Sequence, residues 1–255
     1  MSNKKTLLFI TGGIIMTTIL SGCTSKKKEE IEQSFDQVLA LYPTKDLMDF
    51  YEMEGYRDEE FDEGDKGVWV LDSSMSISND SDSPLITEGM LLKINRNKGT
   101  AEGFYYQWTI PADIKNNEMK EKIYPITYDK QEIHLLEEVD DPELKEKIEN
   151  FQFFVQYGDF KNLVQYEHIR KMYNPNVPIY ELEYQLENDD PNVQQLRQRY
   201  QIPTENAPTL LLKGRGNLAG DSVGYKNVEI RFSKNPSIVF DDSIDYQPDT
   251  EEDNQ

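Results

Sequence analysis

The sequence is poor in the side chains that many catalytic and metal sites need. Its 255 residues include one cysteine, Cys23, and two histidines, His134 and His168. A single cysteine excludes an intramolecular disulfide, a CxxC redox pair and any zinc or iron–sulfur site with several cysteine ligands. Basic side chains are also scarce, with 27 Lys and Arg against 48 Asp and Glu and a formal net charge of −21. This charge argues against nucleic acid as a partner, because phosphate binding requires clustered Lys and Arg.

The first 23 residues predict a bacterial lipoprotein signal. Lys4 and Lys5 precede an uncharged apolar run over residues 6–20, which is shorter than the ~20 residues of a membrane span. The run ends in Leu-Ser-Gly-Cys at 20–23, the pattern of a lipobox. Cleavage would remove residues 1–22 as a signal peptide, and Cys23 would carry a thioether-linked diacylglycerol and a further acyl chain such as palmitate. The alternative is an ordinary secretory signal or membrane anchor, in which a cysteine would occur at this position only by chance.

Residues 23–30 form the lipidated cysteine and its predicted tether. Two or three acyl chains hold a protein on a membrane stably where one is marginal, at ~0.8 kcal/mol per buried CH₂. Lysines at 26–28 follow at once and would either lie over an anionic leaflet or form a solvated linker. We therefore expect attachment to the extracytoplasmic face of the cell membrane through the lipid.

The rest of the chain predicts one α+β domain over residues 31–240, with a mostly antiparallel sheet, N-terminal helices and helices in two connections. Alternating or turn-bounded apolar runs predict strands over residues 68–77, 90–95, 100–108, 122–128, 132–136, 177–186, 209–213, 225–232 and 237–240. An acidic tail over residues 241–255 is expected to be disordered near its end.

Helices are predicted from spacing and from caps. Apolar residues from Ile31 to Tyr42 recur at helical spacing, and Thr44 is expected to cap a second short helix. Asp-Pro pairs at 141–142 and 190–191 each combine an N-cap with proline at the first helical position. The helix after Asp141 is expected to continue through Phe151 towards Val155. Residues 158–173 are expected to be helical or irregular.

Two glycine-rich segments match enzymatic motifs in sequence, but the secondary structure predicted around them does not match. Residues 220–224 spell GxSxG around Ser222, and residues 214–219 spell GxGxxA. A nucleophile elbow and a dinucleotide fingerprint both require a helix after the motif, yet a strand pattern follows at 225–232. No histidine lies C-terminal to Ser222 either. We interpret both motifs as one loop between two strands.

The remaining candidates also favour ordinary structural roles. The acidic groups Asp58, Glu60 and Asp62 have no glycine at the sixth position of a calcium loop, and Asp80 and Asp82 miss the pattern as well. The two histidines lack the spacing of metal ligands. Tyr105, Tyr106 and Trp108 are typical of a binding surface or of sheet packing, and packing is favoured. We predict no catalytic, metal-binding or cofactor-binding residue.

Long segments of the chain resemble the staphylococcal tandem lipoproteins, also described as conserved staphylococcal antigens. The matching segments are LSGC at 20–23, YPTKDLMDFYEMEGYRDEEFD at 42–62, DKGVW at 65–69, YGDF at 157–160, NPNVPIYELEYQLENDDPNVQQLRQRY at 174–200 and APTLLLKGRGNLAGDSVGYKNVEIRF at 207–232. The resemblance implies a lipid-anchored protein associated with innate immune stimulation through the lipid and with invasion of host cells. Cys23 is the only functional residue that it transfers.

Three hypotheses follow for function. The favoured one is a non-enzymatic, virulence-associated surface lipoprotein whose acylated Cys23 meets an innate immune receptor and whose domain binds a host protein. The alternative is a ligand-binding lipoprotein for uptake or envelope maintenance. A hydrolase that uses Ser222 or an Asp/Glu pair is the least favoured.

Overall fold

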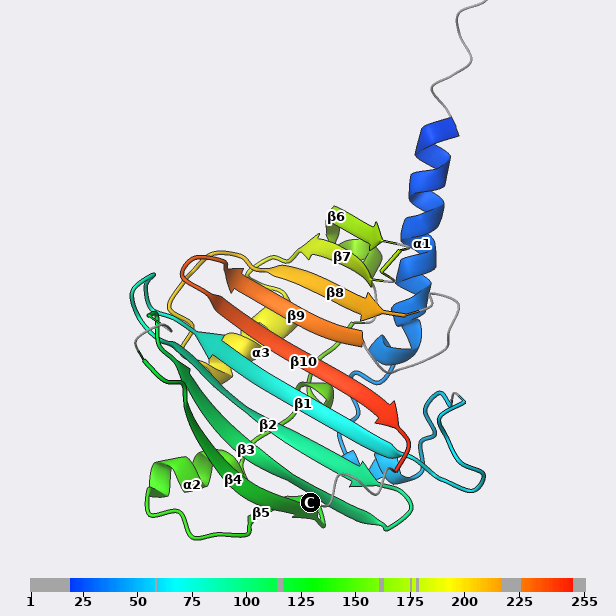
Figure 1. Ribbon diagram of the computed structural model, residues 1–255. Helices are drawn as coiled ribbons and strands as arrows, with labels where there is room; N and C mark the ends of the chain where they lie inside the picture. The colour runs from blue at the N-terminus through cyan, green and yellow to red at the C-terminus, as the bar shows by residue number, and fades with distance from the viewer. Residues whose placement is uncertain are drawn as a thin grey trace, which may run out of the picture.

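A single antiparallel sheet of ten strands dominates the computed structural model (Figure 1). The structure describes residues 19–57, 59–113, 117–160, 163–174, 176–177, 179–216 and 226–249, with side chains from Lys28 onwards. Within this part of the chain, three α-helices accompany the sheet. The architecture confirms the predicted α+β class with a mostly antiparallel sheet.

The sheet consists of two five-stranded meanders joined at its centre. The strand order is β5-β4-β3-β2-β1-β10-β9-β8-β7-β6. The bounds are β1 Val68–Ile77, β2 Leu85–Asn95, β3 Thr100–Ile110, β4 Lys120–Asp129, β5 Glu132–Leu135, β6 Glu167–Asn174, β7 Ile179–Gln185, β8 Thr209–Arg215, β9 Lys226–Ser233 and β10 Ile238–Gln247. The first meander starts at the centre and runs outward, whereas the second starts at the far edge and returns to pair β10 with β1.

One face of the sheet forms the hydrophobic core. Because side chains alternate along a strand, Trp69, Leu71 and Met75 of β1 share a face with Met90 and Leu92 of β2, and all are buried. Helical residues complete this core, among them Phe35, Ile148 and Leu196. We call this the covered face. In Figure 1 helix α3 lies behind the sheet, and the opposite, uncovered face is turned towards the viewer.

The helices begin where the sequence places proline or a polar cap. Helix α2, Pro142–Glu149, has Asp141 as its N-cap, and α3, Pro191–Arg199, has Asp190. Each carboxylate accepts hydrogen bonds from two backbone N–H groups of the first turn, which confirms both predicted caps. Helix α1, Ile19–Leu39, buries Ile31 and Phe35 at the predicted spacing.

Several predicted boundaries are wrong. The short helix η1, Leu47–Tyr51, is capped by Asp46, whereas the Thr44 hydroxyl donates backwards to the Leu41 carbonyl. Helix α2 ends at Glu149, so Phe151 lies outside it, and Val155 falls in a separate 3₁₀ helix, Phe154–Gln156. A further 3₁₀ helix spans Leu163–Gln165.

Two corrections concern strands. Part of the region expected to be helical or irregular over 158–173 is the edge strand β6, whose pairing with β7 shifts register between His168 and Arg170. The strand expected to end at residue 240 continues to Gln247 as β10, so the acidic residues 241–247 belong to the centre of the sheet. Residues 250–255 lie outside the described part of the chain. Asp242 takes one of the buried positions of β10, between Phe240 and Ile244, and this acid interrupts the apolar alternation in the sequence, which explains the error.

Candidate functional site

Helix α1 connects the predicted lipid site to the core. Cys23 lies on this helix, although its side chain is outside the described part of the structure. Farther along, the Phe35 ring packs edge-on against Tyr180 of β7, with ring centres 6.0 Å apart. The Tyr184 hydroxyl donates to Glu32 at 2.5 Å, and Lys28 forms an ion pair with the same carboxylate at 3.2 Å. The helix that carries Cys23 is therefore packed against the second meander of the sheet.

The sequence motifs do not assemble into a common site. The structure does not describe residues 217–225, which include Ser222 and the whole GxSxG motif, and Asp58 also lies outside the described residues. The Asp80 carboxylate accepts the N–H of Asp82 within a turn. No cluster of three or more potential metal ligands occurs among the residues that the structure describes.

The two histidines lie on opposite edges of the sheet. His134 is exposed on β5, whereas His168 of β6 packs its ring edge-on against Tyr184, with ring centres 5.6 Å apart. The His168 Nε2 atom is buried without a hydrogen-bond partner. Burial and the nearby Lys28 ammonium lower the pKa of His168, so its neutral form is favoured. The two imidazoles cannot share a ligand from these positions.

A buried acid that the sequence analysis missed lies on the covered face. Asp242 of β10 is 2% exposed and accepts hydrogen bonds from the hydroxyls of Tyr42 and Ser73. The Ser73 oxygen in turn accepts the backbone N–H of Phe154 at 3.0 Å. Burial raises the pKa of Asp242 well above its ordinary value. These bonds tie the centre of the sheet to two connecting segments, which is a structural role.

The uncovered face carries an ordered aromatic pair. The rings of Tyr106 and Trp108 on β3 stack with centres 4.4 Å apart. The Trp108 indole N–H donates to Glu121 at 2.7 Å, and the Tyr106 hydroxyl donates to Asp72 at 3.0 Å. Tyr106 reaches Asp72 of β1 across Gly89 of β2, where a Cβ atom would lie 2.8 Å from the phenol oxygen. The absence of a side chain at Gly89 therefore permits this contact.

Acidic side chains continue along this face over the central strands. Asp241 of β10 accepts a hydrogen bond from Asn227, and Glu229 of β9 pairs with both Lys213 and Arg231. Burial raises the pKa of Asp72 to about 6 even though the Tyr106 hydroxyl opposes the shift. Burial likewise raises the pKa of Asp241 and Asp245. The uncovered face thus combines fixed aromatic rings with several acids whose pKa is raised by burial. The Tyr-Tyr-Gln-Trp run at 105–108 is the sequence signal for this pair, and the predicted packing role is confirmed for Tyr105 and Tyr106, which are 0% and 3% exposed, whereas Trp108 is partly exposed.

A small cavity of about 310 Å³ opens on the helical side of the sheet. Tyr105, Phe151 and Tyr200 line it together with the basic side chains Lys147 and Arg199. Glu88 accepts hydrogen bonds from Tyr105 at 3.1 Å and from Lys147. The Arg199 guanidinium donates to Gln152 at 2.7 Å and lies 3.8 Å from the centre of the Tyr157 ring. The cavity could accept a small ligand with both apolar and polar groups.

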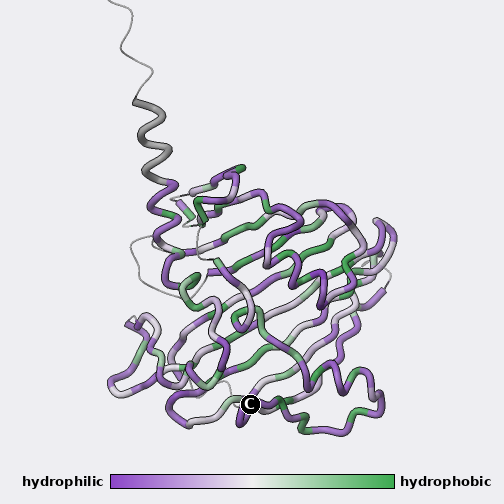
Figure 2. Tube along the Cα trace, turned by 180° about the vertical axis from the view of Figure 1, so that it is seen from behind, coloured by the Kyte–Doolittle hydropathy of each residue, from purple (hydrophilic) through white to green (hydrophobic). Residues whose placement is uncertain are grey.

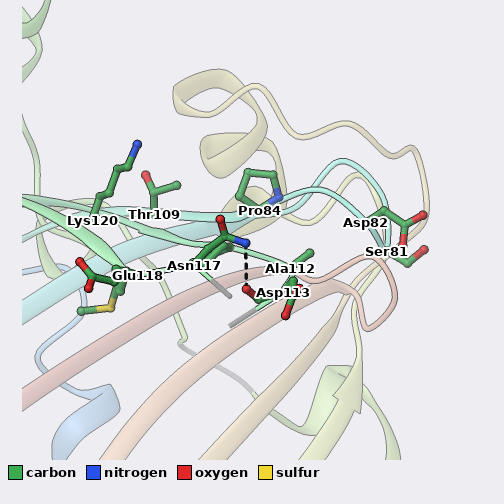
Figure 3. Close-up of a pocket in the computed structure, with 11 residues that line it drawn as sticks. Ser81, Asp82, Pro84, Thr109, Ala112, Asp113, Asn117, Glu118 and Lys120 are labelled. Carbon is green, nitrogen blue, oxygen red and sulfur yellow. Dashed lines mark hydrogen bonds between the residues drawn. The ribbon is translucent and has the colours of Figure 1, made fainter. Parts of the chain in front are cut away.

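A wider hollow of about 900 Å³ lies at one end of the sheet, between the β1–β2 turn and the β3–β4 connection (Figure 3). Asn117 donates to the Asp113 carbonyl at 3.1 Å within it. Its lining comes from both sides of residues 114–116, which are outside the described residues.

Comparison with known proteins adds a family. The sequence profile of the Csa1 family matches residues 27–249. An uncharacterized lipoprotein of Staphylococcus aureus strain N315 is 46% identical over 248 residues, which cover 96% of this chain and 97% of the relative. An uncharacterized lipoprotein of Staphylococcus epidermidis strain ATCC 35984 is 45% identical over 256 residues, covering 97% and 98%. Within the described part of the chain, no helix is long and apolar enough to cross a bilayer.

Proposed function

The chain belongs to the Csa1 family, with staphylococcal lipoproteins as its relatives, and from this premise we propose that it is a lipid-anchored, non-enzymatic binding protein of the cell surface. In this proposal Cys23 carries the acyl chains, which stimulate innate immunity, and the domain binds a host protein that promotes invasion. The stacked Tyr106–Trp108 pair on the uncovered face carries the proposal for the domain.

The aromatic pair has the properties of an interface hot spot. Tyr and Trp are enriched among residues that dominate binding energy, and a preorganised side chain loses little entropy when a partner docks. Trp108 is partly exposed and is held by Glu121, whereas Tyr106 is 3% exposed and supports the indole through the stack. The Trp108 ring is therefore positioned before binding. Partly buried acids beside them favour a partner that presents basic or hydrogen-bond-donating groups.

The anchor is tested by Cys23→Ser. We expect the wild-type chain to partition into the detergent phase of a Triton X-114 extract and to stimulate receptor-bearing cells. Cys23→Ser should lose both properties, because a chain without acyl groups has no stable membrane attachment. Retention of both by Cys23→Ser would contradict the lipid role.

The domain function is tested by cell binding. Wild-type protein displayed on lipid vesicles should bind cultured host cells saturably, and trypsin treatment of the cells should abolish that binding. Vesicles that carry an unrelated lipoprotein of similar net charge are the control. Binding no higher than this control would assign the biological effect to the lipid alone.

A ligand-binding role is the second candidate, because the cavity lined by Tyr105, Phe151 and Tyr200 has a suitable size. A ligand that binds only the folded state raises the melting temperature by mass action. A thermal-shift screen of metabolites, glycans and lipids should then find a compound whose effect disappears in Tyr200→Ala. A flat screen would argue against this role.

A further inference from the structure

Exposed apolar side chains are concentrated at the β6 edge of the sheet. Ten large hydrophobic side chains are exposed among the described residues, and five of them lie between residues 164 and 177. These five, which we call the β6-edge patch, are Val164, Ile169, Met172, Tyr173 and Val177, with exposed fractions of 88%, 47%, 38%, 36% and 53%. A local group of exposed apolar residues in an otherwise acidic protein commonly marks an interaction surface.

The patch lies at the same end of the molecule as the N-terminal turns of α1. Helix α1 packs on β7, the neighbour of β6, through the Phe35–Tyr180 and Glu32–Tyr184 contacts. In Figure 1 the beginning of α1 projects beyond the edge formed by β6, and Figure 2 shows from behind that the later turns of the helix run beside the same end of the sheet. The opposite edge, β5, lies at the far end of the sheet.

The helix sets the distance between the lipid site and this edge. Lys28 is level with the sheet, because its ammonium lies 5.7 Å from the ring centre of Tyr184. Cys23 precedes Lys28 by five residues of continuous helix, which corresponds to a rise of about 7.5 Å at ~1.5 Å per residue. The polar headgroup layer of each leaflet is about 5–8 Å thick. Acyl chains on Cys23 would thus bring the β6 edge to the headgroup layer.

The charge of this edge differs from that of the rest of the protein. β6 carries Arg170 and Lys171 against one acid, Glu167, whereas the whole chain carries −21. Arg170 forms ion pairs with Glu181 at 2.8 Å and with Glu183 at 3.0 Å, which neutralises acids of the adjacent strand. Arg170 and Lys171 thus stand against Glu167, Glu181 and Glu183, so this edge is close to neutral. Anionic lipids would repel it less than the rest of the protein and would attract the lysines at 26–28.

We propose that the β6-edge patch lies against the membrane that holds the acyl chains and forms a second, reversible contact with its anionic lipids. The inference rests on the acylation of Cys23 in the proposed function. The sheet then stands on its β6 edge, with β5 farthest from the membrane. Its uncovered face points sideways, where a partner can reach Trp108 without meeting the bilayer.

The single cysteine makes a direct test feasible. The acyl chains occupy Cys23, so one introduced cysteine takes a nitrobenzoxadiazole label at one position only. Ile169→Cys places the label in the patch, and Ile123→Cys on β4 is the matched control, since the two side chains are 47% and 46% exposed. Each full-length, acylated variant is reconstituted into vesicles of phosphatidylglycerol and phosphatidylcholine that contain a lipid with a nitroxide on its headgroup.

We expect the nitroxide lipid to quench most of the fluorescence at position 169 and almost none at position 123. Equal quenching at the two positions, whether strong or absent, would overturn the proposed edge while the protein still floats with the vesicles. A protein that does not float would overturn the anchor and this inference together. If a pyrene label at position 169 forms excimers and the nitroxide lipid does not quench it, the partner of the patch is the β6 edge of a second copy and the membrane contact is overturned.

Discussion

Acidic side chains have different environments on the two faces of the sheet, although the same strands supply the acids of both faces. On the covered face, Asp242 is 2% exposed, and the hydroxyls of Tyr42 and Ser73 donate to its oxygens. On the uncovered face, Asp72 and Asp241 lie on the same two central strands, β1 and β10. Their partners are Tyr106 and Asn227.

Strand parity thus separates two roles within a few residues. An acid at a covered position holds connecting segments to the sheet, because each missing hydrogen bond would leave a buried polar atom unsatisfied. At uncovered positions, Asp72 and Asp241 are partly exposed on the face that a partner would meet. Changes of equal chemical size should therefore cost much stability on the covered face and little on the uncovered one.

Removal of a large ring should show the widest gap between the faces. Phe154 is 0% exposed and contacts the rings of Tyr42, Phe160 and Phe240. We expect Phe154→Ala to lower the free energy of unfolding by about 3–5 kcal/mol through cavity formation, as measured by urea denaturation. Phe104→Ala on the uncovered face is the control and should cost far less. Equal losses would show that the uncovered face is packed like a core.

Insertion of one methyl group tests how the aromatic pair is positioned. A Cβ atom at Gly89 would lie 2.6 Å from the Ser73 carbonyl oxygen and 2.8 Å from the Tyr106 hydroxyl. Gly89→Ala should cost about 1–3 kcal/mol by overpacking and should change the fluorescence emission of Trp108, because Tyr106 must move. An unchanged emission spectrum would mean that Tyr106 does not depend on this gap.

Loss of one hydroxyl on each face gives a matched pair. Tyr42→Phe leaves an oxygen of Asp242 without its donor in a buried site and should cost about 1–3 kcal/mol. Tyr106 is as buried as Tyr42, but its acceptor Asp72 is partly exposed whereas Asp242 is 2% exposed, so Tyr106→Phe should cost less. Chemical denaturation of both variants measures the difference. A larger loss in Tyr106→Phe would reverse the proposed assignment of roles.

The pH dependence of stability should show the smallest effect. The pKa of Asp72 is raised to about 6 in the folded state, above its ordinary value of 3.8. A carboxyl with a raised folded pKa favours the folded state when protonated, so its contribution is lost as pH rises through about 6. The melting temperature should therefore fall less between pH 5 and pH 7 in Asp72→Asn than in the wild type. Glu63→Gln, at an exposed loop acid, is the control and should follow the wild type.

The sequence predicted the parts of the fold that depend on local signals. Asp-Pro pairs fixed the starts of two helices, and apolar alternation located β1 and β2, because burial on one face imposes a period of two. The sequence did not predict β6 or the second half of β10, because exposed or acidic side chains obscure the apolar alternation in these strands. The Asp242 cluster also required the fold, since Tyr42 and Ser73 are distant from it in sequence.

The binding role of the uncovered face is tested most directly by one substitution. The affinity of vesicle-displayed protein for host cells should be measured for the wild type, Trp108→Ala and Tyr56→Ala, an aromatic control that is 38% exposed in a loop. The account predicts that Trp108→Ala weakens binding by about tenfold or more, as expected for a hot spot, while Tyr56→Ala binds like the wild type. Wild-type affinity in Trp108→Ala would contradict the account.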